Sequence, residues 1–216
     1  MKTIALFGAS GGLGSQLLPL LETKYNVIGL SSSDIDVTNY AQVNKFFKTN
    51  NIDIVVNLSG YNFDIFAHKI AGYDVLTQID KQVDINIMGT INIVSNCLNK
   101  MREQQFGRII LVSSVLADHP VISTSVYSGC KGFVDSFTKT VALENANKNI
   151  NCNSLQLGYF DGGLTYKIPE NFRDTIKNNI PSKRWGMITE LYNTIDYMIE
   201  TGYITGQNIN ISGGII

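Results

Sequence analysis

Short apolar runs and longer amphipathic stretches alternate along the whole chain, and this alternation is the feature that most restricts its fold. Each run has the length of a buried strand, is rich in Ile or Val and is bounded by Gly, Ser or Asn. Strands that alternate with helices form βαβ units, whose parallel sheet is covered by helices on both faces. The sequence therefore predicts one α/β domain over residues 1–216, a doubly wound parallel sheet of about six strands. The predicted strands are Thr3–Phe7, Asn26–Leu30, Ile54–Leu58, Arg108–Ser113, Asn151–Leu157 and Asn208–Ile211.

The stretches between the predicted strands carry apolar residues at helical spacing. In the longest of them apolar side chains recur about every four residues, as on one face of an amphipathic helix. No internal repeat, low-complexity tract or interdomain linker interrupts the pattern. Besides a helix that follows the first strand, the predicted helices are Thr38–Asn50, Val75–Met101, Tyr127–Asn145 and Thr189–Glu200.

The charge balance and the cysteines restrict the class of protein. With 17 basic and 18 acidic residues the net charge is −1, which leaves no electrostatic footprint for nucleic acid or for an anionic membrane. The three cysteines, Cys97, Cys130 and Cys152, are widely spaced and read as reduced thiols, and two histidines argue against a metal site. No apolar run approaches the roughly 20 residues of a membrane-spanning helix. We therefore expect a cytoplasmic protein without a metal, nucleic-acid or membrane partner.

A glycine-rich turn joins the first predicted strand to the first helix. Gly8, Gly12 and Gly14 stand in the spacing Gly-x-x-x-Gly-x-Gly, with Ser10 and Leu13 among the residues between them. Glycine lets the backbone N–H groups at a helix N-terminus come close to a pyrophosphate, so a turn of this kind is typical of dinucleotide binding. A purely structural turn between strand and helix is the alternative interpretation of the same glycines.

Tyr127 and Lys131 are four positions apart near the start of a predicted helix, so their side chains share one face. A protonated lysine beside a phenol favours the phenolate, and we expect it to lower the pKa of Tyr127 from about 10. Such a phenol exchanges a proton with a carbonyl or alcohol oxygen while hydride moves. Because a Tyr-x-x-x-Lys pair can arise by chance, the assignment depends on its setting, in which Ser114 ends a predicted strand thirteen residues before Tyr127.

With these motifs in place, the chain resembles the short-chain dehydrogenase/reductase family over nearly its whole length. The glycine spacing, the segment 57–60, the pair Asp36-Val37 and the pair Gly213-Gly214 all match segments of that family. The resemblance implies a Rossmann fold and a reaction that interconverts a carbonyl and an alcohol with NAD(P)H. It also implies the catalytic residues, which are Asn86, Ser114, Tyr127 and Lys131.

The resemblance gives each of these residues a role. The serine hydrogen-bonds the substrate oxygen, the tyrosine is the general acid/base, and the lysine tunes the tyrosine and binds the nicotinamide ribose. The asparagine, matched through Ile85–Gly89, holds a water that relays protons to the lysine. The cofactor-binding residues that it implies are Gly8, Ser10, Gly12, Leu13, Gly14, Ser31, Ser32, Asp36, Val37, Asn57, Ser59, Gly60, Tyr127, Lys131 and Gly158.

Two segments depart from the family pattern. Between the second strand and Asp36 there is no room for the family's additional helix and strand, so we expect the sheet to lack that edge strand and the adenosine side to be open. After Leu157, which stands in place of the family's proline, Gly162 occupies the position of a threonine that contacts the cofactor. Thr165 is a candidate substitute for that threonine.

The choice between the two nicotinamide cofactors depends on the end of the second strand. An NAD-specific site places Asp or Glu there to bind the ribose 2′-hydroxyl. Ser31, Ser32 and Ser33 occupy that turn instead, and hydroxyl groups tolerate a 2′-phosphate. We therefore expect NADP(H) to be favoured over NAD(H), although Asp34 could turn inward and no arginine is present to hold the phosphate.

The sequence thus favours an NAD(P)H-dependent carbonyl reductase or alcohol dehydrogenase, paired through its long helices into a homodimer or homotetramer. Residues 159–185 are expected to form a lid over a small-molecule, partly apolar substrate. A non-catalytic dinucleotide-binding sensor or partner protein on the same fold is the alternative. A sugar-nucleotide-modifying enzyme is a further alternative, which usually needs a larger C-terminal substrate domain than the residues after Gly158 provide.

Overall fold

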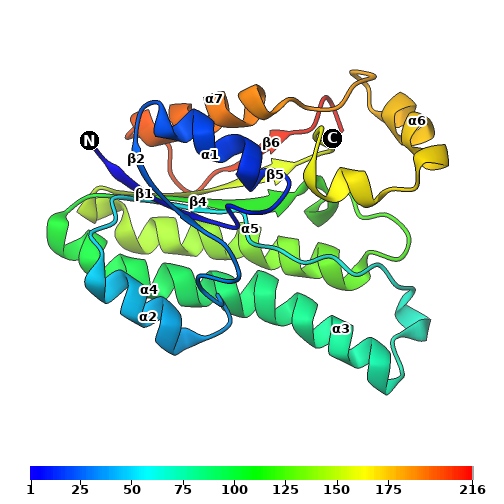
Figure 1. Ribbon diagram of the computed structural model, residues 1–216, viewed down its shortest axis with the longest axis horizontal. Coiled ribbons are helices and arrows are strands. Elements are labelled where there is room, and N and C mark those ends of the chain that lie inside the picture. The colour runs from blue at the N-terminus through cyan, green and yellow to red at the C-terminus, as the bar shows by residue number, and fades with distance from the viewer. Residues whose placement is uncertain (216) are drawn as a thin grey trace.

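A computed structural model describes residues 1–215 of the chain, with the side chains of Tyr73 and Lys167 left aside. Six parallel strands form one sheet in the order β2-β1-β3-β4-β5-β6, and helices cover both faces (Figure 1). The doubly wound parallel sheet and its number of strands are confirmed. The strands are β1 (Thr3–Phe7), β2 (Asn26–Leu30), β3 (Ile54–Asn57), β4 (Gly107–Ser114), β5 (Ile150–Leu157) and β6 (Asn208–Ile211).

Strand β2 lies at the edge of the sheet, as the short connection after it predicts. The chain leaves Leu30, passes through a turn and enters helix α2 (Tyr40–Thr49), with no further strand in this part of the chain. Asn39 caps that helix, since its side chain accepts a hydrogen bond from the backbone of Gln42. The expected absence of the additional edge strand is therefore confirmed.

The two helical layers pack against opposite sides of every strand. Helices α1 (Gly14–Glu22) and α7 (Ile188–Glu200) cover one face, and α2, α4 (Gly89–Gln104) and α5 (Ser125–Asn145) cover the other (Figure 1). Because side chains of a strand alternate between faces, Ile4 and Leu6 enter the first core while the intervening residues of β1 enter the second. Each half of the core is thus built from the same buried strands.

The predicted helix Val75–Met101 contains an interruption. It consists of α3 (Tyr73–Val83), a π-helical turn η2 (Asp84–Met88) and α4. A π-turn shifts the side chains after it relative to those before it, and such turns are frequent at functional sites. Asn86, a predicted catalytic residue, lies in this turn and is 1% exposed.

The segment after β5 contains the short helix η5 (Gly163–Lys167), which begins against the glycine-rich turn, and α6 (Glu170–Asn179), which projects from the body of the protein (Figure 1). The remaining short helices are η1 (Ala67–Lys69), η3 (Val115–Ala117) and η4 (Ala146–Lys148). Within residues 1–215, no helix is both long and apolar enough to cross a membrane.

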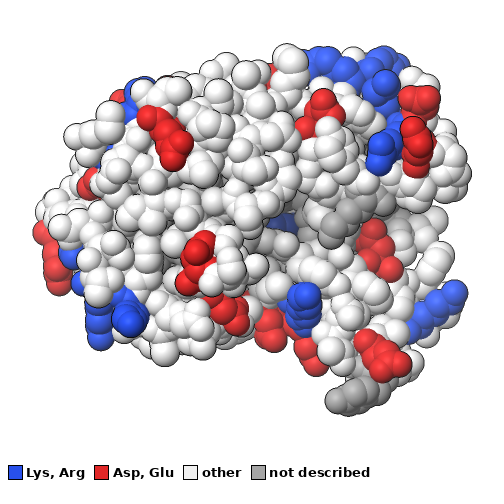
Figure 2. All heavy atoms as spheres, in the orientation of Figure 1, with Lys and Arg blue, Asp and Glu red and all other residues white. Residues whose placement is uncertain are grey.

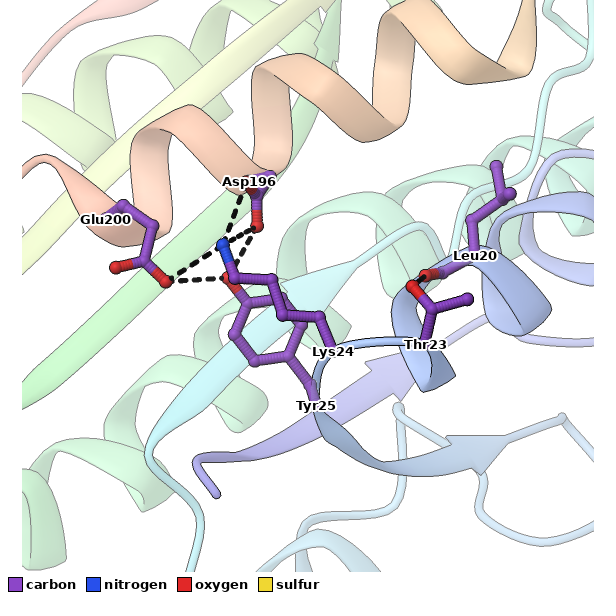
Figure 3. A network of polar contacts seen from close by, with 6 residues as sticks. All are labelled: Leu20, Thr23, Lys24, Tyr25, Asp196 and Glu200. Atoms are coloured by element: carbon purple, nitrogen blue, oxygen red, sulfur yellow. Dashed lines mark hydrogen bonds and ion pairs between the residues drawn. The ribbon is translucent and has the colours of Figure 1, made fainter.

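A polar network joins the α1–β2 connection to helix α7 where the strands have their amino ends, which we call the amino-terminal edge of the sheet (Figure 3). The Tyr25 hydroxyl lies 2.6 Å from Asp196 Oδ1 and 3.0 Å from Glu200 Oε1. Lys24 Nζ lies 2.8 Å from the same Asp196 oxygen and 3.2 Å from Glu200 Oε1. These contacts fix α7 to the edge of the sheet that faces away from the site described next.

Candidate active site

A cavity of about 700 Å³ lies at the carboxyl ends of the strands, beside β1 and β3. The strand order reverses between these two strands, because β2 is added on one side of β1 and β3 on the other. Ligands of doubly wound sheets bind at this switch point. The face seen in Figure 2 carries acidic and basic groups side by side, so no single charge dominates it. The cavity is lined by residues from the glycine turn, from β4 and α5 and from the segment after β5. Those predicted from the sequence are Gly8, Gly12, Leu13, Gly14, Gly60, Ser114, Tyr127, Lys131 and Gly158.

Each glycine of the Gly-x-x-x-Gly-x-Gly motif lies where the backbone passes too close to other atoms for a side chain. A Cβ on Gly14 would lie 2.1 Å from the Gly8 carbonyl oxygen, and one on Gly12 would lie 2.4 Å from the Gly163 nitrogen. Gly8 has a φ of +79°, in the region that glycine favours, and its Cβ would lie 2.9 Å from the Ser59 nitrogen. Gly12, Leu13 and Gly14 line the cavity at the start of α1, and a glycine-rich turn at a helix N-terminus is the kind of cradle that a pyrophosphate needs.

The missing threonine after β5 has a structural reason. Gly162 has a φ of +144° and Gly163 a φ of +59°, so both residues adopt conformations that side chains disfavour. The Gln16 amide ties this loop to the glycine turn, donating to the Gly12 carbonyl at 2.8 Å and to the Asp161 carbonyl at 3.2 Å. Thr165, the suggested substitute, is 6% exposed and lines the cavity.

Tyr127, Lys131 and Ser114 come together at one wall of the cavity. Tyr127 is the third residue of α5 and Lys131 follows one turn later on the same face. Lys131 Nζ lies 5.5 Å from the centre of the Tyr127 ring and donates a hydrogen bond to the Val112 carbonyl at 2.9 Å. The Ser114 hydroxyl accepts from the Leu116 backbone at 3.2 Å and bonds Tyr127. A phenol, an ammonium and a hydroxyl therefore converge at one place.

Burial dominates the ionisation of both groups. It raises the pKa of Tyr127 above its usual value, with the charge of Asp64 and the neighbouring Cys130 acting in the same direction and the bond from Ser114 opposing them. It lowers the pKa of Lys131 to about 8. The expectation that Lys131 lowers the pKa of Tyr127 is therefore wrong in this structure, because the cost of burying a phenolate dominates and Lys131 is not among the groups that shift this pKa. The phenol therefore carries its proton near neutral pH.

Asn86 has one half of its amide paired and the other half open. Its Nδ2 donates to the Tyr61 carbonyl at 2.7 Å and to the Gln82 carbonyl at 2.8 Å. Its Oδ1 is buried and, among the described residues, has no hydrogen-bond partner. A Cβ on Gly60 would lie 3.2 Å from this oxygen and 3.7 Å from Lys131 Nζ, so Gly60 leaves open the space between them. Buried polar atoms without a protein partner are the usual positions of ordered water.

A stripe of three amides on the α3–η2 helix holds the loop that follows β3, and sequence reasoning missed it. Gln78 accepts from the Tyr61 hydroxyl, Gln82 accepts from the Phe63 backbone, and Asn86 donates to the Tyr61 carbonyl. These three side chains share one helix face because they are four residues apart. That spacing was the available signal, since amides on the buried face of an amphipathic helix need partners.

Asp64, at the end of this loop, is a second residue that sequence reasoning missed. It is the one acidic residue among the described residues that line the cavity. Burial raises its own pKa, and its charge raises the pKa of both Tyr127 and Tyr159. The carboxylate therefore faces the wall on which the predicted general acid lies. No local sequence motif identifies Asp64, because its position depends on the loop that the three amides hold.

Several predicted cofactor-binding residues do not line the cavity. Asp36 forms a turn in which its side chain accepts from the Thr38 backbone at 2.9 Å. Val37 is buried in the core, where a Cβ on Gly89 would lie 2.7 Å from its side chain. Asn57 is also buried and accepts from the Ser59 backbone at 3.0 Å, which shapes the loop after β3. Ser10 is exposed within the glycine turn.

Ser31 and Ser32 lie in the turn after β2, where Asp34 has turned inward. The Asp34 carboxylate accepts from the Ser31 backbone at 2.8 Å and from the Ser31 hydroxyl. These two hydrogen bonds lower the pKa of Asp34 and keep it ionised. The sequence left open that Asp34 turns inward, and in the structure its carboxylate bonds Ser31, so the turn carries a negative charge.

Other polar and thiol side chains have structural roles or lie outside the cavity. Ser113 donates to the Lys131 carbonyl at 3.1 Å and so fixes α5 on β4. His119 is exposed and does not line the cavity. The three cysteines are free and buried. Over residues 1–215, no group of three or more His, Cys, Asp or Glu side chains is placed to hold a metal ion.

Comparison with known proteins gives a consistent picture. The family model described as "Enoyl-(Acyl carrier protein) reductase" matches residues 18–216. The chain is 28% identical to the 3-oxoacyl-[acyl-carrier-protein] reductase FabG of Rickettsia typhi, over 100% of this chain and 97% of the relative. It is 29% identical to carbonyl reductase family member 4 of Xenopus laevis, over 99% and 98%. The solved structure "ElxO with NADP Bound" shares the fold, with a TM-score of 0.87 at 22% identity over 99% of this chain and 98% of that one.

Proposed function

We propose that the chain, which belongs to the short-chain dehydrogenase/reductase family and is an NAD(P)H-dependent oxidoreductase, reduces a neutral carbonyl compound to an alcohol at the cavity beside Tyr127. The observation that carries the proposal is the convergence of Tyr127, Lys131 and Ser114 on one wall of a cavity that also contains the glycine turn. The names of the two relatives both denote reduction of a carbonyl, which supports the direction. Nothing in the comparisons supports a non-catalytic sensor or a sugar-nucleotide enzyme.

In the proposed mechanism, the residues of the chain orient the carbonyl and supply its proton. The hydroxyl of Ser114 donates a hydrogen bond to the carbonyl oxygen and stabilises the charge that develops there. Tyr127, kept protonated by burial, donates its proton to the same oxygen. The ammonium of Lys131 stabilises the tyrosinate that remains, and water held at Asn86 Oδ1 returns a proton toward it. When bound, the nicotinamide cofactor supplies the hydride.

The residues present fit a dinucleotide. The bare glycines would hold its pyrophosphate, Lys131 would reach the nicotinamide ribose, and Thr165 would take the place of the missing threonine. We propose a small preference for NADP(H), supported by the hydroxyls of Ser31 and Ser32 and by the NADP bound to the fold neighbour ElxO. The preference is small because the charge of Asp34 repels a 2′-phosphate.

Replacing Asp34 tests this account of the cofactor. Asp34→Asn keeps an acceptor for Ser31 and removes the charge, so kcat/KM for NADPH relative to NADH should rise by about threefold, as expected for one solvent-exposed charge. The measurement is the initial rate at varied concentrations of each cofactor. A strong preference of the unmodified protein for NADH, or no change of the ratio in Asp34→Asn, would contradict the proposal.

The substrate pocket favours neutral and partly apolar compounds. Leu116, Phe172 and Ile176 present apolar side chains to the cavity, whereas Asp64 disfavours an anionic group beside the reacting carbonyl. We propose that residues 159–185, which contain η5 and α6, close over this pocket as a lid within the one domain of residues 1–216. A panel of ketones and aldehydes followed by NADPH oxidation tests the proposal, with Tyr127→Phe as the control that should lose the activity.

Assembly and location complete the proposal. Helix α5 carries Leu143, which is 84% exposed, and the half-buried stacked rings of Phe133 and Phe137, so we propose a homodimer or homotetramer that covers this helix. Sedimentation equilibrium would show a single small species if the chain is monomeric, which would contradict it. The cytoplasm is the proposed compartment, supported by three cysteines that are buried as free thiols.

A further inference from the structure

A carboxylate is buried one helical turn beyond the candidate catalytic lysine. Asp135, on α5, is 5% exposed. Its Oδ1 accepts from the Ser154 hydroxyl at 2.7 Å and its Oδ2 accepts from the Gln156 amide at 2.7 Å. Among the described residues, no basic side chain comes within ion-pair distance of Asp135. Two strand residues therefore hold in place a charge that has no direct counter-ion.

The counter-charge that the fold places nearest on this helix face is Lys131. Residues four apart on a helix share a face, and both side chains are buried between α5 and the sheet. Lys131 also has no carboxylate partner, since its Nζ donates to the Val112 carbonyl. The other buried cation of the described residues, Arg108, donates to the Ile199 and Asn149 carbonyls at the far edge of the sheet. Burying either charge alone is unfavourable, and each reduces the cost of the other.

We propose that Asp135 is a positioning residue that acts through Lys131, because its buried negative charge keeps the lysine protonated at the pH at which the enzyme works. This inference rests on the proposed function, in which protonated Lys131 stabilises the tyrosinate and binds the cofactor ribose. It adds to that function a residue that touches neither the substrate nor the cofactor.

Of the groups that surround Lys131, Asp135 is the one to which we assign the negative charge that keeps the lysine protonated. Burial lowers the pKa of Lys131 to about 8, while Cys130 and Asp135 act in the opposite direction. Burial also raises the pKa of the Cys130 thiol, so that thiol is uncharged near neutral pH. Tyr127, whose ring centre lies 5.5 Å from Lys131 Nζ, is uncharged near neutral pH because burial raises its pKa. The loop after β3 contributes Asp64 across the cavity, Asp118 at the end of η3 shares the Gln156 amide with Asp135, and β4 and η2 contribute the neutral Ser113, Ser114 and Asn86. Removing the charge of Asp135 therefore lowers the pKa of Lys131 further, and the lysine loses its proton at a lower pH.

The hydrogen bonds around Asp135 allow its charge to be removed without leaving a donor unpaired. The Ser154 hydroxyl lies 2.9 Å from Asn208 Oδ1, and the Gln156 amide lies 2.7 Å from Asp118 Oδ2. Asp135→Leu therefore leaves each donor with another acceptor, and Asp135→Asn keeps the shape of the side chain. Ser154→Ala is the matched control, because it removes one hydrogen bond from the carboxylate and keeps the charge.

The experiment measures the affinity of the whole protein for NADPH by fluorescence titration from about pH 6 to 10, which spans the lysine pKa values in question. We expect the affinity of the unmodified protein to fall with a midpoint near pH 8, and the midpoint to move down by about one unit in both Asp135 variants. It should stay in place in Ser154→Ala and vanish in Lys131→Met. The basic limb of kcat/KM for reduction should move with it.

A folded Asp135 variant whose midpoint does not move, with activity lowered equally at every pH, would overturn the inference and leave Asp135 a structural role only. Thermal melting establishes that the variants are folded, and agreement between Asp135→Leu and Asp135→Asn excludes an effect of shape. Because cofactor binding does not require turnover, this result is separate from a failure of the proposed function, which would appear as no turnover of any carbonyl by the unmodified protein.

Discussion

Two clusters at opposite edges of the sheet contain the same two side chains, a tyrosine and a lysine, in opposite electrical surroundings. At the amino-terminal edge, Lys24 and Tyr25 bond the carboxylates of α7 (Figure 3). At the carboxyl edge, Lys131 donates to a backbone carbonyl, and Tyr127 bonds the hydroxyl of Ser114. Hydrogen bonds to Asp196 raise the pKa of Lys24, whereas burial lowers that of Lys131 to about 8.

The difference assigns a role to each cluster: Lys24 and Tyr25 stabilise the fold, whereas Lys131 and Tyr127 are placed to perform the proposed chemistry. A tyrosine bonded to two carboxylates is fixed, and its proton has no route to a substrate. A tyrosine that faces a cavity, beside a buried cation, can give up its proton and be stabilised as the anion. The same contrast applies to the amides, since among the described residues Asn86 Oδ1 has no hydrogen-bond partner while most buried polar atoms are paired.

The largest expected effect is that of Tyr127→Phe, which removes the proton donor and keeps the ring. We expect kcat for reduction to fall by about 10³-fold, the usual size of a general acid's contribution. Cofactor affinity and thermal stability should change little, because Lys131 and the glycine turn are untouched. Steady-state kinetics and melting curves measure both, and turnover undiminished in this variant would refute the mechanism.

Lys131→Met is expected to have the second largest effect, and it acts on both catalysis and cofactor affinity. Loss of the ammonium should lower kcat/KM by about 10²-fold and weaken cofactor binding. The melting temperature should change little, because the gain from an apolar side chain is offset by the cost of leaving Asp135 without its nearest counter-charge. Lys24→Met is the matched control and should leave kinetics unchanged. Unaltered cofactor affinity in Lys131→Met would argue against contact with the ribose.

The amino-acid sequence contains most of the fold and the catalytic wall, because both follow from local patterns. Thr3–Phe7 and Asn208–Ile211 are predicted with the bounds they have, and Tyr127 and Lys131 share a face because of their spacing. The sequence does not show which loop lies against which helix. The placement of Asp64 and the pairing of Asp135 with Gln156 both join segments distant in the chain.

The direction of the pKa shift of Tyr127 could not be predicted from the sequence either. It depends on how deeply α5 buries the phenol, a property of the packed protein. Similarly, Asp34 could be named as able to turn inward, but only the folded turn fixes its carboxylate on Ser31. The π-turn around Asn86 leaves no mark in the apolar periodicity of the predicted helix 75–101.

A smaller effect is expected at the amino-terminal edge. Tyr25→Phe removes a hydroxyl bonded to Asp196 and Glu200 and should lower the free energy of unfolding by about 1.5 kcal/mol, the scale of a hydrogen bond to a charged group. The melting temperature should fall by a few degrees, while kcat and KM stay as they are. A loss of activity in a folded Tyr25→Phe variant would mean that the two edges are coupled and that the comparison fails.

The most direct test of the central claim is to measure the two lysines themselves. Lysine side chains labelled with ¹³C at Cε are titrated by NMR from about pH 6 to 11, a range that includes the ordinary lysine pKa. The structure predicts one resonance that titrates near pH 8 and disappears in Lys131→Met, and another, lost in Lys24→Met, that titrates above the ordinary value. If the resonance assigned to Lys131 titrates at or above the ordinary value, then the lysine at the cavity is neither desolvated nor unpaired, and the proposed distinction between the two edges is wrong.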